Sequence, residues 1–173
     1  MYDIYSNSRS DLWRFTLGRS GNRKLITIGL NPSTATEEKS DATVAKVEQV
    51  ARRNGFEGFV MLNLYPVRST DFRALAVRAN AKAFAENLKT IESVVATESK
   101  PVIWAAWGDS ILAREFFVDS AKELFERLQK YGTSWQRFGP FTASGYPRHP
   151  SRLKYAWGFS PLEAKSYVRT LGS

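Results

Sequence analysis

Polar side chains that could take part in chemistry stand directly after apolar runs at four places in the sequence. They are Asn31 with Ser33, Asn63, Gly108 with Asp109, and His149 with Ser151. An amide both donates and accepts hydrogen bonds, and an imidazole can donate to a group that gains negative charge. If the apolar runs are parallel strands, their carboxyl ends share one edge of the sheet, where ligands bind. The spacing therefore predicts one polar site, and the plain alternative is a set of ordinary strand-to-loop turns.

The last of these segments is rich in positive charge. Arg148, Arg152 and Lys154 lie within one stretch of the sequence, with a tyrosine on either side. Basic residues mixed with aromatic ones suit phosphate contacts and base stacking. The alternative is a solvated loop in which His149, placed between two prolines, only caps a turn.

Composition favours an anionic partner. The chain has 173 residues, with 25 Lys and Arg against 17 Asp and Glu, which gives a net charge of +8 and a pI near 9.8. We predict that it binds a nucleotide or a nucleic acid, DNA rather than RNA; a solubilising surface charge is the alternative. The absence of cysteine excludes disulfides and thiolate metal sites, and a single histidine excludes a multi-histidine site. We therefore expect no metal and no cofactor.

The sequence also bears on location. No apolar run reaches the roughly 20 residues that span a bilayer, and the N-terminal segment lacks the apolar core of a signal peptide. We expect a cytoplasmic monomer that does not enter a membrane.

Hydrophobic periodicity predicts one α/β domain over residues 1–173. The expected strands lie at 24–30, 59–64, 101–107 and 138–143, with an edge strand at 11–17. Four helices are expected: the first begins after Asp41 and runs to 54, and the others lie at 80–97, 110–131 and 161–171. Strands that alternate with helices predict a three-layer α/β/α fold with a mostly parallel four-stranded sheet.

Three of these segments resemble motifs of the uracil-DNA glycosylase superfamily. The segment 29–33, Gly-Leu-Asn-Pro-Ser, is similar to its first motif, and most similar to the Gly-x-Asn-Pro-Gly of the mismatch-specific branch. The segment 149–153, His-Pro-Ser-Arg-Leu, resembles its last motif, His-Pro-Ser-Pro-Leu. The segment 61–63, Met-Leu-Asn, is similar to a strand that ends in a base-reading asparagine. The resemblance implies a uracil-DNA glycosylase-like fold.

A longer part of the chain, roughly residues 10 to 155, resembles the DUF1643 family, whose function is not established. The matching blocks, in order, are 30–35 (LNPSTA), 41–43 (DAT), 63–70 (NLYPVRST), 105–108 (AAWG) and 145–150 (GYPRHP). This resemblance implies a fold and no activity.

The glycosylase resemblance implies a role for each matching residue. The catalytic pair is Asn31, which would hold the attacking water, and His149, which would donate a hydrogen bond to the departing base. The substrate would be bound by Leu30, Pro32, Ser33, Asp41, Asn63, Gly108 and Ser151, with Asn63 reading the edge of the base. Nucleic acid would be held by Arg68, Arg148, Arg152 and Lys154, with Leu153 as a wedge in the gap left by a flipped nucleotide.

Three differences from the glycosylase motifs keep other functions open. Ser33 stands where the mismatch-specific branch has glycine, and Arg152 replaces a proline. No aspartate stands beside Asn31, so the activation of water is weak unless Asp41 reaches the site. The first hypothesis is hydrolysis of a nucleobase–sugar bond in DNA or a related nucleotide. The second is binding of nucleic acid or a nucleotide without catalysis, and the third is action on an unrelated small molecule.

Overall fold

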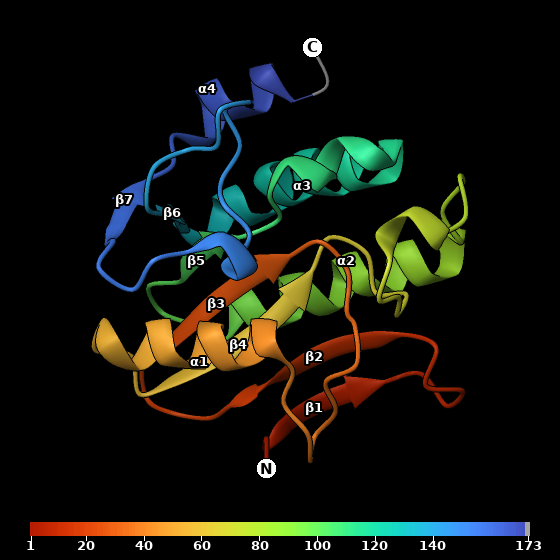
Figure 1. The fold of residues 1–173 in the computed structure, drawn as a ribbon, viewed down its shortest axis with the longest axis horizontal. Coiled ribbons are helices and arrows are strands. Elements are labelled where there is room, and N and C mark those ends of the chain that lie inside the picture. Colours follow the sequence, from red (N-terminus) through yellow and green to blue (C-terminus); the bar gives the residue numbers. More distant parts are fainter. Residues whose placement is uncertain (172–173) are drawn as a thin grey trace.

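The apolar run that precedes Asn31 forms β3, the middle strand of a seven-stranded sheet. The computed structural model describes residues 1–171. Their strands are β1 (Ile4–Asn7), β2 (Arg14–Arg19), β3 (Lys24–Gly29), β4 (Gly58–Asn63), β5 (Val102–Ala105), β6 (Ser134–Phe138) and β7 (Phe159–Pro161). Their α-helices are α1 (Ala42–Arg53), α2 (Ala81–Ala96), α3 (Glu115–Leu128) and α4 (Ala164–Thr170). The expected α/β class is confirmed (Figure 1).

The sheet is larger and more mixed than predicted. Its order is β1-β2-β4-β3-β5-β6-β7, and the inner strands β4, β3, β5 and β6 are parallel. The pairs β1–β2, β2–β4 and β6–β7 are antiparallel. The prediction of a mostly parallel four-stranded sheet is therefore wrong, although four parallel strands do form its centre. The outer strands were missed because β1 and β7 are short and their residues do not form an apolar run.

Three element boundaries also differ from prediction. β6 ends at Phe138 instead of beginning there, because Gly139 adopts a positive φ of 75° and a proline follows. The expected helix at 110–131 is divided: a 3-10 turn at Asp109–Ala113 precedes α3 and another follows it. The helix expected at 161–171 starts only at Ala164, because Phe159–Pro161 pair with β6 and form β7.

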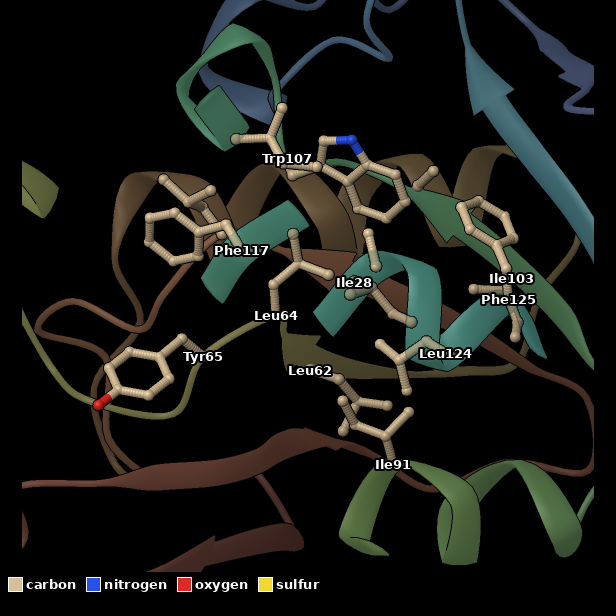
Figure 2. Packing of buried hydrophobic residues seen from close by; sticks show 14 of the residues in the cluster. Ile28, Leu62, Leu64, Tyr65, Ile91, Ile103, Trp107, Phe117, Leu124 and Phe125 are labelled. Atoms are coloured by element: carbon tan, nitrogen blue, oxygen red, sulfur yellow. The ribbon is translucent and has the colours of Figure 1, made fainter. Parts of the chain in front are cut away.

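Helices cover both faces of the sheet, and a hydrophobic core lies between each face and its helices. On one face α1 buries Val44, Val47 and Val50. On the other face Ile28 and Leu62 of the strands meet Ile91 of α2, and α3 adds its own apolar residues (Figure 2). No helix among residues 1–171 is long and apolar enough to cross a membrane.

Two helix starts follow the sequence signals closely. The side chain of Asp41 accepts hydrogen bonds from the backbone N–H groups of Thr43 and Val44 at the start of α1. Asn80 accepts from Ala83 N at the start of α2. Such caps satisfy donors that have no partner inside the helix, and the predicted cap at Asp41 is confirmed.

Candidate functional site

A cleft of about 800 Å³ opens at the carboxyl ends of the inner strands. The predicted site residues that line it are Leu30, Asn31, Ser33, Asp41, Asn63, Gly108, Arg148, His149, Ser151 and Arg152. Those that do not are Pro32, Arg68, Leu153 and Lys154. Its volume falls in the range of cavities that enclose small-molecule ligands. Loops far apart in sequence, one carrying Asn31 and one carrying His149, thus meet around a single space.

His149 is held as a neutral imidazole with a defined tautomer. Its Nδ1 accepts the backbone N–H of Ser151 at 3.2 Å and lies 2.8 Å from the Ser151 hydroxyl. A backbone N–H can only donate, so the neutral ring carries its proton on Nε2. Burial lowers the pKa of His149 from 6.5 to about 4, against the opposing effect of the Asp41 charge. Residues 1–171 offer Nε2 no hydrogen-bond partner, so this N–H remains available to a ligand.

The loop after β5 supports the histidine loop from the side. Gly108 donates its backbone N–H to Pro147 O at 3.0 Å. Gly108 has a φ of +72°, and a Cβ there would lie 3.1 Å from the Cβ of His149. Both the backbone conformation and the close approach therefore require glycine.

The opposite wall is tied in the same way. Asn31 Nδ2 donates to Pro32 O at 3.1 Å and to Ser69 O at 3.0 Å. Ser69 N donates in turn to Pro32 O at 2.9 Å. These bonds join the loops after β3 and β4. They also leave the Asn31 Oδ1 oxygen, rather than the amide nitrogen, to accept a hydrogen bond from a ligand or a water.

Asn63 is the most deeply placed polar residue that lines the cleft. It is 1% exposed, and neither its Oδ1 nor its Nδ2 has a hydrogen-bond partner within residues 1–171. The side chain lies against Gly29, where a Cβ would come within 2.9 Å of Asn63 Oδ1. A buried amide without partners costs roughly 1–3 kcal/mol. A group that supplies both a donor and an acceptor would recover that cost.

Arg14, at the start of β2, is a cleft residue that sequence reasoning missed. It is 2% exposed, its Nη1 donates to Ala35 O at 3.2 Å, and its Nε has no partner in the described chain. Burial lowers the pKa of Arg14 to about 10, and the nearby charge of Arg68 also acts to lower it. The guanidinium is nonetheless charged at neutral pH.

Arg68, predicted to hold a phosphate, is instead occupied by the protein. Its Nη1 donates to Ser33 O and Ala35 O, both at 2.9 Å. Its Nη2 donates to the Tyr5 hydroxyl at 2.6 Å, and Nε and Nη2 both donate to Asp11 Oδ1. Because its donor groups are used in these bonds, Arg68 is placed as a structural residue behind the cleft wall.

Asp41, considered as an activator of water, is also engaged. Besides the cap of α1, its Oδ2 accepts Ala35 N at 3.3 Å. Both oxygens of this carboxylate thus accept backbone N–H groups. The other acidic residue at the cleft, Asp109, accepts the Thr142 hydroxyl.

The remaining predicted residues lie at the rim or outside it. Arg148 donates to Pro140 O and Phe141 O and stacks over Trp157, whereas Arg152 is exposed. Leu153 packs, partly buried, against the α1 core, and Lys154 lies 6.0 Å from the Trp157 ring.

Comparison with known protein families identifies the chain. The model of a family described as "Protein of unknown function (DUF1643)" matches residues 11–151. The chain belongs to the DUF1643 family. Neither the curated proteins nor the solved structures that were searched contain a significant match. The resemblance to glycosylases therefore stays a prediction.

The DUF1643 match includes the whole cleft except Arg152. It leaves out β1, β7 and α4, which lie at the ends of the chain. The part that this DUF1643 protein shares with its family is thus the part that builds the cleft.

Two aromatic residues, Phe72 and Trp107, also line the cleft of this DUF1643 protein and were not predicted as site residues. Phe72 starts a 3-10 turn capped by Asp71 just after the loop that follows β4. Its only sequence signal is an aromatic residue beside a polar loop. In the described residues no group of three His, Asp or Glu side chains is arranged to hold a metal ion.

Proposed function

We propose that this DUF1643 protein binds a nucleobase in the cleft and hydrolyses the N-glycosidic bond between that base and its sugar, in DNA or a related nucleotide. The observation that carries the proposal is the buried amide of Asn63, whose donor and acceptor lack partners in residues 1–171. Nucleobase edges present a donor and an acceptor side by side. An asparagine amide is complementary to such an edge.

His149 supplies what the departing base requires. Breaking the bond between C1′ and the base nitrogen leaves negative charge on the base and positive character on the sugar. A neutral imidazole with its proton on Nε2 can donate a hydrogen bond to that developing charge. Removing one such donor from an enzyme costs about 3–4 kcal/mol of transition-state stabilisation.

Asn31 supplies a position for water. Because its Nδ2 is committed to Pro32 O and Ser69 O, its Oδ1 is oriented by the fold and can accept from the attacking water. The new bond forms between the water oxygen and C1′, and the proton that water loses balances the charge on the base. The similarity of segments 29–33 and 149–153 to glycosylase motifs supports the same pairing of Asn31 with His149.

A second candidate function is binding of the same ligand without hydrolysis. The observation that favours it is the engagement of both acidic residues at the cleft, Asp41 by backbone N–H groups and Asp109 by Thr142. Neither is left as a dedicated base for water. Binding alone would use the same contacts with Asn63 and would involve no turnover.

The two functions are separated by an assay for base release. Single- and double-stranded oligonucleotides and free nucleotides carrying uracil, hypoxanthine or a mismatched base would be incubated with the wild type, Asn63→Ala and His149→Ala. Catalysis predicts base release that falls roughly 100- to 1000-fold in His149→Ala. No release from any substrate, together with binding that weakens steeply with salt, would select the second function. Neither release nor binding would refute both.

A further inference from the structure

The cleft contains a buried positive charge that the protein does not neutralise. No ion pair in the described part of the chain includes Arg14, and Asp41, the acidic residue whose charge acts on it most, is already held by three backbone N–H groups. Its neighbour Arg68 adds a second positive charge. A buried charge without a partner is costly, so such sites are usually completed by an opposite charge.

A shift in the strand register directs the side chain of Arg14 into the cleft. The β1–β2 register shifts between Ser6 and Asn7, so that Thr16 faces Ser6 and Arg14 faces Asn7. The extra residue, Phe15, is a bulge, and bulges redirect side chains. Strict alternation would send Leu17 and Arg14 to opposite faces. Instead Leu17 packs in the α1 core and Arg14 bonds to Ala35 O in that same core.

Arg14 and Asn63 lie at the same end of neighbouring strands. β2 runs antiparallel to β4, with Leu17 facing Met61, so the start of β2 and the end of β4 lie at the same edge of the sheet. Arg14 N donates to Pro66 O at 2.9 Å, just beyond that end. Both side chains line the cleft. An amide without partners and a guanidinium with one neutral partner therefore border one space.

We propose that Arg14 binds the phosphate of a free mononucleotide whose base contacts Asn63. The inference rests on the base binding proposed above and narrows its ligand class from nucleic acid to a nucleotide with a terminal phosphate. A guanidinium presents donors that match phosphate oxygens. A phosphate dianion would give Nε of Arg14 the acceptor that it lacks. Its negative charge would also compensate the neighbouring positive charges of Arg14 and Arg68.

Depth within the protein favours a free nucleotide over a polymer. Arg14 is 2% exposed, whereas the rim residue Arg152 is exposed. A phosphodiester has chain on both sides and would stay at the rim, near Arg152. A terminal phosphate has chain on one side only and can enter the cleft with its base.

The test compares four probes by thermal shift and calorimetry: inorganic phosphate, 2-deoxyribose 5-phosphate, deoxynucleosides, and the matching deoxynucleoside 5′-monophosphates. We expect a monophosphate to bind the wild type more tightly than its nucleoside. In Arg14→Met the monophosphate affinity is expected to fall roughly 10- to 100-fold, to the level of the nucleoside. Nucleoside affinity is expected to stay the same, because Asn63 is untouched.

The substitution is expected to leave a folded protein, because Ala35 O keeps a hydrogen bond from Arg68 Nη1. Arg14→Lys, which keeps the charge and loses the planar fork, is a second variant. The matched control is Arg52→Met, an exposed arginine on α1. It is expected to leave the affinity for all four probes unchanged.

The outcomes separate this inference from the function on which it rests. Two outcomes overturn this inference alone and leave the proposal of base binding intact. One is equal affinity of the wild type for a nucleoside and its monophosphate, and the other is a monophosphate affinity that does not change in Arg14→Met. Binding of phosphate but of no base-containing probe overturns both the mononucleotide assignment and the base-binding proposal. A short oligonucleotide that carries the same base is measured alongside these four probes. If it binds more tightly than the monophosphate, the ligand is a polymer and the inference is overturned.

Discussion

Arg14 and Arg68 both donate to Ala35 O, yet the protein treats these two arginines in opposite ways. Arg68 is surrounded by acceptors: two carbonyls, a tyrosine hydroxyl and the carboxylate of Asp11. Arg14 is more deeply buried and has one neutral acceptor. The saturated arginine holds loops together, whereas the unsaturated one borders a cleft.

The same contrast separates two buried asparagines. Asn87 Nδ2 donates to Asn63 O and Leu64 O, and thereby joins α2 to the end of β4. The Asn63 side chain lacks a partner at both Oδ1 and Nδ2 within residues 1–171, whereas Asn87 lacks one at Oδ1 alone. Other buried polar atoms without partners, such as Thr27 Oγ1 and Trp104 Nε1, lie away from the cleft, so the distinction applies only to residues that line it. There, a polar side chain whose partners are in place holds the loops together, and one that is buried without partners is available to a ligand. Each of the following measurements could contradict that distinction.

The largest effect is expected at Arg68. Arg68→Met would leave Ser33 O, the Tyr5 hydroxyl and Asp11 short of a partner, and should lower the free energy of unfolding by about 3 kcal/mol. Urea denaturation measures this. Arg52→Met, which removes an exposed arginine, should change stability by less than about 0.5 kcal/mol. If the two variants are equally stable, the saturated network around Arg68 does not hold the loops.

The next effect concerns the support of the histidine loop. Gly108→Ala combines a positive φ with a crowded contact to His149 and should cost about 2 kcal/mol. Gly55→Ala has a similar φ of +76° but nothing within 4 Å of the new Cβ, so its cost isolates the backbone effect. Denaturation of both variants gives the contribution of the contact by difference. If the two variants lose the same free energy of unfolding, the loop that carries His149 moves away from the new Cβ at no cost.

The comparison of the asparagines becomes quantitative in a pair of substitutions. Asn63→Leu replaces an unpartnered amide by an apolar group of similar size, and stability should rise by about 1 kcal/mol while base binding is lost. Asn87→Leu removes two hydrogen bonds and should lower stability by about 2 kcal/mol. Urea denaturation of both variants measures whether the free energy of unfolding rises in the first and falls in the second. A loss of stability in both would show that the Asn63 amide serves the fold.

The smallest effect is expected from pH. His149 is the only histidine of the chain, so its imidazole can be titrated by NMR without assignment ambiguity. Burial lowers its pKa from 6.5 to about 4, which means that the unfolded chain binds a proton before the folded one does. The stabilising contribution is therefore complete above pH 6.5 and is lost as the pH falls toward 4, with about 0.7 kcal/mol lost between pH 7 and pH 6. A midpoint near 6.5 would place the ring in solvent.

The centre of the fold was readable from local patterns. β3, β4 and β5 are continuous apolar runs, and α1 and α2 have apolar residues at helical spacing. Each of these patterns is compatible with only one type of secondary structure, so the sequence alone predicts it. β6 was misplaced because only Trp135 and Phe138 of its residues are buried, three positions apart. That spacing does not show the alternation of apolar and polar residues that marks a strand. β1 and β7 depend on pairing with neighbours that only the folded chain provides.

Part of the site was readable for a similar reason. Asn31, Asn63 and His149 follow strands or prolines, and the topology of parallel strands brings such residues together. Arg14 was not readable, because its alternation with Trp13 and Phe15 indicates an edge strand with a solvated arginine. Its burial results from a register shift against β1, which is a tertiary event.

The hydrogen bonds within each wall have a consequence for kinetics. One wall is tied by Asn31 to Ser69 and the other by Gly108 to Pro147. Neither wall has to reorganise before a ligand can enter, so no slow closing step limits association. In a stopped-flow experiment, capture should then appear as a single phase whose rate rises in proportion to concentration, without reaching a plateau.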